Sequence, residues 1–261
     1  MLKRRCVKNL VFLYILAAGM VYTAANVSYT TLDEAVTTTV VSVEVQTIIP
    51  IPDPKPKTQL TGGRIFWLGS EDKNQVALTF DDGPNPEYTP QILAVLDKYH
   101  VKVTFFMVGE IAQRYPKVVR KVTEQGHEVA DHTMTHPEAP KADSQMLRQE
   151  VRGSAQLLEQ ISGKKIHYLR PPYGYFDAAY FQACRDNNMD VVLWSIVPRD
   201  WEQPPAEVIV QRVAAEIRPG AIVLLHDGGG DRRQTVKALP LLIEAIQAKG
   251  LQAVTLSQLL E

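Results

Sequence analysis

The chain has 261 residues, of which 45% are hydrophobic and 22% are charged, a composition typical of a folded globular protein. Its 28 Lys and Arg residues nearly balance 29 Asp and Glu residues, and a net charge of −1 gives no electrostatic basis for binding nucleic acid. The two cysteines, Cys6 and Cys184, do not support a disulfide framework, because Cys6 lies in an N-terminal segment with a different character.

That N-terminal segment, residues 1–27, has the pattern of an export signal. Four basic residues among the first eight precede an apolar run that starts at Leu10 and continues to about Val27, with small residues around Ala24. The run is close to the lower length limit for a spanning helix, so a cleaved signal peptide and a retained membrane anchor both fit. In either case we expect an extracytoplasmic protein, secreted or anchored at the cell envelope through N-terminal membrane contact.

Residues 28–62 are rich in threonine, valine and proline and predict a linker. Four prolines between Pro50 and Pro56 alternate with other residues, which favours an extended, semi-stiff spacer. The run Val40–Val45 is also compatible with a short strand. We therefore expect a spacer that connects the N-terminal segment to a catalytic domain at residues 63–261.

Within that domain, short apolar runs alternate with longer amphipathic runs. The expected strands are Gln75–Phe80, Val103–Val108, Glu128–Ala130, Ile166–Leu169, Val191–Trp194, Ala221–Leu225 and Gln252–Thr255. The expected helices are Gln91–Tyr99, Ile111–Gln125, Ser144–Ile161, Asp177–Asn187, Ala206–Ile217 and Val236–Lys249. Such alternation predicts an α/β fold with a parallel sheet, and seven strands are compatible with a barrel or a doubly wound sheet.

Ionisable side chains follow five of the seven expected strands. They lie in the stretches Asp81-Asp82, Asp131–His136, Arg170–Gly174, Arg199–Trp201 and His226–Gly230. Because the carboxyl ends of parallel strands meet at one face of the fold, these groups should converge there. The sequence therefore predicts a functional site at this face.

Two adjacent carboxylates, Asp81 and Asp82, repel each other at a desolvated strand end unless a cation lies nearby. His132 and His136 could supply further ligands, since two imidazoles and one carboxylate suit zinc or another divalent ion and leave positions for water and substrate. We expect Asp82 to bind the metal and Asp81 to take a proton from the attacking water. The histidine spacing alone is a weak signal, because histidines four residues apart also occur by chance on helices.

Other strand ends offer groups for proton transfer. His226 is either a hydrogen-bonded core histidine or a general acid whose pKa is raised by Asp200. Trp201 either lines an apolar pocket or belongs to the core. His127 lies at the opposite end of its strand, and we expect it to be structural.

The stretch after the fourth expected strand carries two further candidates. Arg170 precedes two prolines at a strand end, and we expect it to fix Asp81 rather than to be a surface charge. Those prolines lack amide donors and stiffen the turn, so the backbone N–H of Tyr173 is expected to be free to bind an oxyanion.

Five stretches together resemble the motifs of the polysaccharide deacetylase (NodB-homology) domain, carbohydrate esterase family 4. They are Thr79–Pro84, His132–His136, Arg170–Gly174, Arg199–Trp201 and Leu224–His226. Their order and number make the resemblance specific, and it covers residues 73–261. It implies a distorted (β/α)7 barrel and the removal of N-acetyl groups from N-acetylglucosamine units of chitin oligomers or peptidoglycan. It also implies a divalent cofactor, usually zinc, with cobalt or another ion as alternatives.

The resemblance assigns a role to each motif residue. It implies metal ligation by Asp82, His132 and His136, a base at Asp81 with Arg170 as its partner, an acid at His226 supported by Asp200, and substrate binding by Tyr173, Trp201 and Leu224. Many relatives carry another Asp three residues before Asp200, where this chain has Val197. That departure puts in doubt any hydrogen bond made by the extra carboxylate, and activity is still expected.

Two other functions are compatible with these motifs. An O-acetyl xylan esterase of the same family shares all of them, and a non-catalytic glycan-binding wall protein would keep the fold. The presence of every group that the chemistry needs favours an enzyme over the latter. The expected partner is an acetylated polysaccharide, while the sequence specifies neither an oligomeric state nor the physiological metal.

Overall fold

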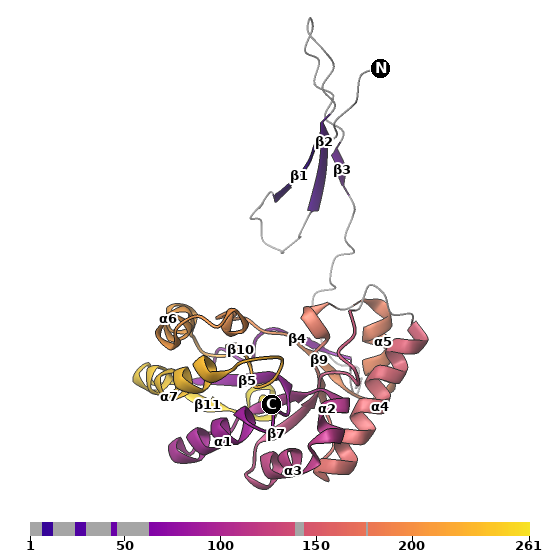
Figure 1. Cartoon of the computed structure of the whole chain (residues 1–261). Helices are drawn as coiled ribbons and strands as arrows, with labels where there is room; N and C mark the ends of the chain where they lie inside the picture. The colour runs from indigo at the N-terminus through magenta and orange to yellow at the C-terminus, as the bar shows by residue number, and fades with distance from the viewer. Residues whose placement is uncertain (1–6, 13–23, 30–42, 46–62, 139–143, 176) are drawn as a thin grey trace, which may run out of the picture. The chain divides into compact units, whose positions relative to one another are not determined.

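The structure, a computed structural model, describes residues 7–12, 24–29, 43–45, 63–138, 144–175 and 177–261, in two units that divide after Thr58. In the first unit, β1 (Val7–Phe12), β2 (Ala24–Tyr29) and β3 (Val43–Val45) form an antiparallel sheet in the order β1-β2-β3 (Figure 1). The export signal and the linker fall mostly outside the described ranges and stay predictions. None of the helices in those ranges has the length and apolar character that crossing a membrane requires.

The second unit contains a parallel sheet. Its strands are β4 (Ile65–Phe66), β5 (Gln75–Gly83), β6 (Thr104–Met107), β7 (Glu128–Asp131), β8 (Tyr168–Leu169), β9 (Asp190–Val192), β10 (Ile222–His226) and β11 (Gln252–Val254). They lie in the order β10-β5-β6-β7-β8-β9-β4, and β11 pairs with the first residues of β5. All seven expected strands are therefore present, and β4 is an addition.

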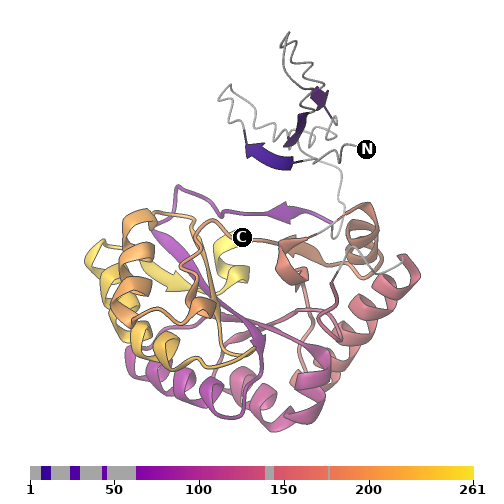
Figure 2. The same ribbon diagram turned by 45° about the horizontal axis from the view of Figure 1, so that its top comes forward.

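Helices lie on the outer side of most of these strands (Figure 2). They are α1 (Tyr88–Tyr99), α2 (Gly109–Arg114), α3 (Pro116–Glu124), α4 (Ser144–Ser162), α5 (Ala178–Asp186), α6 (Ala206–Glu216), α7 (Arg233–Ala248) and α8 (Leu256–Leu260). The expected helix Ile111–Gln125 is wrong as one element, because α2 and α3 are separate. Pro116 begins α3, and the residue before a proline, Tyr115, is disfavoured in helical geometry and has φ −126°. The short helix α8 was not expected, although Thr255 and Gln258 form a capping box at its start.

The two ends of the strand order approach each other. Ile196, which follows β9, forms a parallel bridge to Val223 of β10, and Leu68, which follows β4, forms an antiparallel bridge to Ala221. The α/β fold with a parallel sheet is thus confirmed. The approach of its two ends depends on isolated bridges rather than on a continuous ladder.

Side chains along β5 alternate between two cores. Val76, Leu78 and Phe80 belong to the large apolar cluster that includes the inner faces of the helices, whereas Ala77 belongs to a smaller cluster on the other face. Burial of each large apolar side chain contributes about 1.5–3 kcal/mol. Side chains alternate along the strand up to Asp81, so its carboxylate lies on the same face as Ala77, at the carboxyl end of the strand.

Candidate active site

A pocket of about 410 Å³ lies at the carboxyl ends of the strands. It is lined by Asp81, Asp82, His132, His136, Pro171, Tyr173, Trp194, Trp201, Leu224, His226, Gly229 and Arg232. The parallel register of β5 and β10 pairs His226 with Asp81, which brings two distant motifs side by side. The predicted site residues all line this pocket except Arg170 and Asp200, which are buried behind it.

Adjacent residues of a regular strand point to opposite faces, yet Asp81 and Asp82 both reach this pocket. The pairing of β5 with β6 shifts register between Phe80 and Gly83, and Asp82 has a left-handed φ of 69°. An irregularity of this kind re-aims a side chain at the end of a strand. It is the local reason why two neighbouring carboxylates share one site.

Asp82, His132 and His136 converge in the pocket. Asp82 Oδ1 lies 3.4 Å from His132 Nε2 and 3.3 Å from His136 Nε2, and one ligand atom from each residue lies within 4.8 Å of the others. Burial raises the pKa of Asp82, but the neighbouring imidazoles of His132 and His136 outweigh burial and hold the pKa well below its usual range. These three residues form the candidate metal site.

The orientation of His132 is set by the backbone. Its Nδ1 lies 2.6 Å from the carbonyl oxygen of Arg170, which can only accept, so Nδ1 carries the proton. In the neutral ring Nε2 then carries the lone pair, and it lies 3.4 Å from Asp82 Oδ1. A histidine whose second nitrogen donates to a carbonyl is the usual arrangement for a metal ligand.

The two histidines lie on a loop rather than on a helix. Thr133 and His136 have φ values of 67° and 59°, and buried acids hold this strained segment. Asp131 Oδ1 accepts the Thr133 N–H at 2.9 Å, and Glu150 of α4 accepts the N–H and the hydroxyl of Thr135 at 2.8 and 2.9 Å. The sequence left the role of Asp131 open, and the structure places it as a support of the loop.

Arg170 is fully buried and holds Asp81. Its Nη1 donates to Asp81 Oδ1 at 2.7 Å and to the Thr79 hydroxyl at 2.8 Å, while Nε and Nη2 donate to the carbonyls of Val192 and Leu193. The predicted contact between Arg170 and Asp81 is therefore present. The other oxygen of Asp81, Oδ2, lies 3.8 Å from His132 Nε2, on the side of the candidate metal site.

His226 and Asp200 form a second charged pair. Asp200 Oδ1 lies 2.8 Å from His226 Nδ1, and Oδ2 accepts the His226 N–H and the Thr235 hydroxyl at 2.9 and 2.8 Å. Burial lowers the pKa of His226, but Asp200 together with the carboxylates across the pocket raises it above its usual value. Asp200 obtains these partners although position 197 is a valine.

Tyr173, Trp201 and Leu224 lie on the walls of the pocket. Tyr173 is in a left-handed conformation with φ 59°, and its N–H makes no hydrogen bond to any described residue. The Tyr173 ring packs edge-on against the His136 ring, with 4.9 Å between ring centroids. The Trp201 ring packs in the same way against His226, with 5.3 Å between centroids. Leu224 is buried and also lines the pocket.

Three residues of the site were missed by sequence reasoning. Glu150 lies mid-helix, where no local pattern sets it apart. Asp227, directly after His226, is buried, and burial raises its pKa to about 7. Its carboxylate occupies the space that a Cβ at Gly83 would need, so only glycine fits there. Arg232 follows three glycines at a strand end, a position that could have marked it as a wall of the pocket.

The chain is similar to known proteins. The family model described as polysaccharide deacetylase matches residues 69–192. A peptidoglycan-N-acetylglucosamine deacetylase from Bacillus cereus is 40% identical over 200 residues, which are 76% of this chain and 93% of the relative. A chitooligosaccharide deacetylase from Bradyrhizobium is 39% identical over 196 residues, with 70% of this chain and 90% of the relative covered.

Solved structures agree with the sequence matches. The Bc1960 peptidoglycan N-acetylglucosamine deacetylase has a TM-score of 0.73 at 32% identity, covering 76% of this chain and 93% of that one. A CE4 family pseudoenzyme from Bacillus anthracis, BA3943, has a TM-score of 0.72 at 29% identity, covering 76% and 69%. Since a pseudoenzyme superposes equally well, the side chains of the site, rather than the fold, must carry any argument for catalysis.

Proposed function

The chain belongs to the polysaccharide deacetylase family, and we propose that it is a metal-dependent hydrolase that removes N-acetyl groups from N-acetylglucosamine units of a polysaccharide. One observation carries the proposal. A three-residue ligand set lies in the same pocket as an arginine-held carboxylate, Asp81, and a carboxylate-held imidazole, His226. These are the groups that hydrolysis of an amide needs.

The ligand set fits a divalent ion. Two ligands that are each ~2.0–2.1 Å from a zinc ion at a tetrahedral angle lie about 3.4 Å apart. The two imidazole nitrogens lie 3.4 and 3.3 Å from Asp82 Oδ1. When bound, such an ion would supply Lewis acidity, which activates water for attack and polarises the acetyl carbonyl.

Asp81 is proposed as the base. Arg170 occupies Oδ1 and fixes the carboxylate, while Oδ2 is directed toward the ligand set, where the attacking water must lie. A carboxylate held in this way can take the proton of water without first rearranging.

His226 is proposed as the acid. An amine is a poor leaving group unless it is protonated, so the imidazole must begin the reaction charged. The Asp200 carboxylate favours that charged state, and the raised pKa of His226 supports this role. The N–H of Tyr173 would donate to the oxygen of the tetrahedral intermediate, a contact typically worth about 3 kcal/mol. Trp201 and Leu224 would enclose the acetyl methyl group.

Peptidoglycan and chitin-type oligosaccharides are the proposed substrates, since the relatives named above carry those names. A protein that acts on cell-wall glycan works outside the cytoplasm, which agrees with the basic and apolar pattern of residues 1–27. We therefore propose an extracytoplasmic enzyme, secreted or anchored at the cell envelope.

Acetate release tests the proposal. The full chain is incubated with chitooligosaccharides, peptidoglycan and acetylated xylan, each with a chelator and after addition of zinc or cobalt. We expect acetate from the glucosamine-containing substrates, its loss with the chelator, and its return with the metal. Turnover of xylan alone would indicate an O-acetyl esterase. Binding of glycans without turnover under any metal would indicate a non-catalytic protein.

A further inference from the structure

A second buried arginine, Arg232, lines the pocket beside the residues proposed above. It is 3% exposed. Its Nε donates to the carbonyl of Gly228 at 2.7 Å, and Nη1 donates to the carbonyl of Asp231 at 3.3 Å. Across the described residues, Nη2 makes no hydrogen bond and Arg232 has no ion pair. A guanidinium cannot lose its proton, so this is a buried positive charge without a carboxylate.

Arg170 provides the contrast within the same site. All three of its nitrogens donate, one of them to the Asp81 carboxylate, and its charge is therefore matched inside the protein. Arg232 has two neutral carbonyls as partners and retains unused donors. Burying a charge without an opposite charge is costly, which gives Arg232 a strong preference for an anion that enters the pocket.

The surroundings of Arg232 hold it in place and favour negative charge. It is the N-cap residue of α7, a helix of 16 residues whose amino end adds partial positive charge. Asp231, the preceding residue, accepts the Tyr88 hydroxyl at 3.2 Å and pairs with Arg233, which ties the loop to α1 and to α7. The guanidinium is thus presented by a fixed loop rather than by a mobile surface chain.

We propose that Arg232 forms a subsite for a carboxylate on the sugar next to the N-acetylglucosamine under attack. The inference rests on the proposed deacetylase function and names its substrate class. In peptidoglycan glycan, the neighbouring sugar carries a lactyl ether, whose carboxylate is free where the stem peptide has been removed. Chitin offers hydroxyl and acetamido groups at that place and has no anion to pair with Arg232. The preferred substrate is therefore a glycan with free muramic acid carboxylates.

Three tetrasaccharides separate the charge from the other features of the substrate. The first alternates N-acetylglucosamine with N-acetylmuramic acid and keeps its carboxylates, the second is the same compound with both carboxyls amidated, and the third is chitotetraose. Affinity for each is measured by calorimetry and kcat/KM by acetate release. We expect the wild-type chain to favour the first over the second at least tenfold, since hydrogen bonds to charged groups are the stronger ones.

The variants are Arg232→Met, Arg232→Lys and a matched control, Arg218→Met, which removes an exposed arginine that does not line the pocket. Arg232→Met should reduce the tenfold preference to about one. Arg232→Lys should keep part of the preference, because lysine has the charge but lacks the planar, bidentate guanidinium. Arg218→Met should keep the preference in full. Thermal unfolding and metal content establish that each variant is folded and loaded.

Two results would overturn the inference. The first is that the wild-type chain shows equal affinity and equal kcat/KM for the free and the amidated tetrasaccharide. The other is an equal loss on all three substrates in Arg232→Met, which would mean that Arg232 only supports the Gly228 loop. Should no substrate release acetate, the deacetylase proposal fails, while calorimetry on the first two compounds still decides whether Arg232 binds the carboxylate.

Discussion

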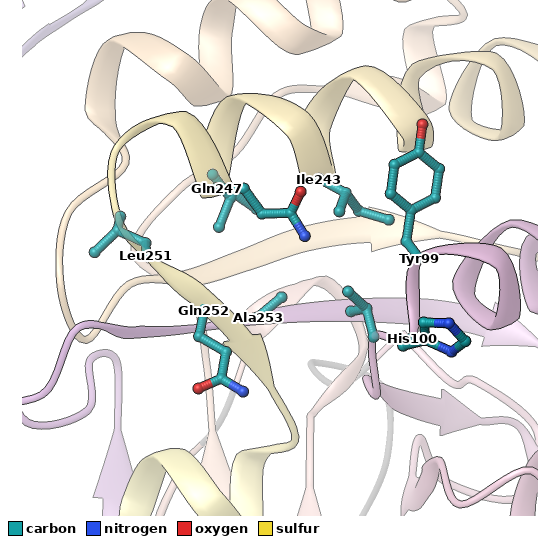
Figure 3. A pocket seen from close by; sticks show the side chains of 9 residues that line it. Tyr99, His100, Ile243, Gln247, Leu251, Gln252 and Ala253 are labelled. Carbon is teal, nitrogen blue, oxygen red and sulfur yellow. The ribbon is translucent and has the colours of Figure 1, made fainter.

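The two ends of the parallel sheet each carry a hollow with a tyrosine and a histidine, and they differ in charge. At the amino ends, a space of about 150 Å³ lies between the end of α1, with Tyr99 and His100, and the α7 residues Ile243 and Gln247 (Figure 3). The described groups that line it include no acid, and Tyr99 donates to Glu244 outside it. The larger pocket at the carboxyl ends contains two acids and three imidazoles, with further acids buried behind it.

Two histidines, one at each end of the sheet, show how a nearby acid changes the pKa of an imidazole. His127, at the amino end of β7, has its pKa lowered to about 4 by burial and by the nearby Lys102. His226 is partly buried, but its pKa is raised because Asp200 and the pocket carboxylates outweigh burial. Burial alone keeps an imidazole neutral, and a paired carboxylate is what keeps it charged and able to act as an acid.

Removal of the Asp81 charge should have the largest effect. In Asp81→Asn the proposed base is lost, and we expect kcat to fall by about 10²–10⁴, the usual contribution of general base catalysis. Metal content, measured after dialysis, should remain, because Asp82, His132 and His136 are unchanged. Loss of the metal together with activity would contradict the separation of base from ligand. Full activity with metal bound would eliminate Asp81 as the base.

Without the Asp200 carboxylate, the pKa of His226 should be lowered by burial, as that of His127 is. In Asp200→Asn the pKa of His226 should fall toward that of a merely buried imidazole, so the alkaline limb of the kcat profile should move to lower pH. Since the acid must begin protonated, kcat at neutral pH should fall as well. The measurement is the pH profile on one substrate, with Thr235→Val as a control that removes one neutral hydrogen bond. If the alkaline limb of the kcat–pH profile is the same in Asp200→Asn as in the wild type, Asp200 does not set the pKa of His226.

A smaller effect is expected where an acid acts on the site through the backbone. Glu150→Gln weakens the hold on Thr135, and therefore on the loop between His132 and His136. Partners that orient ligands typically contribute 10–100-fold to metal affinity, and we expect about a tenfold loss, measured by competition with a chelator. Glu159→Gln is the matched control on the same helix, since Glu159 contacts Lys165 and the Ile166 N–H instead. Equal affinity in both variants would remove Glu150 from this role.

Much of the site could be predicted from the sequence because alternating strands and helices predict a parallel sheet, whose strands all end at one face. Once strands and helices alternate, polar residues directly after a strand must meet at one face, and Asp81, His132, Arg170 and His226 do so. Strand positions were recoverable for the same reason, since buried parallel strands are short apolar runs between helices.

The remainder depends on contacts that have no local signal. Glu150 reaches the site from the middle of a helix, and only packing against β7 reveals it. The amphipathic pattern continues across residues 111–125 and predicts one helix. Pro116 divides it into α2 and α3, because a proline disfavours helical geometry at the residue before it, Tyr115. Arg232 was passed over because a charged residue in a glycine-rich loop is normally solvated, and its burial follows from the Gly228 and Asp231 carbonyls that hold it.

The smallest effect on activity is expected at the amino end, in His127→Gln. The folded chain binds the His127 proton only near pH 4, whereas the unfolded chain binds it near the ordinary value of 6.5. The unfolded state therefore holds more protons in this range, and as the pH falls from 6.5 to 4 the wild type loses up to roughly 3 kcal/mol of unfolding free energy, which the variant does not lose. Denaturation at several pH values should show the difference in unfolding free energy shifting in favour of the variant as the pH falls from 6.5 to 4. We expect kcat at neutral pH to be unchanged. Parallel stability curves would mean that the folded state accepts the proton at His127 without penalty, and the contrast with His226 would then lose its basis.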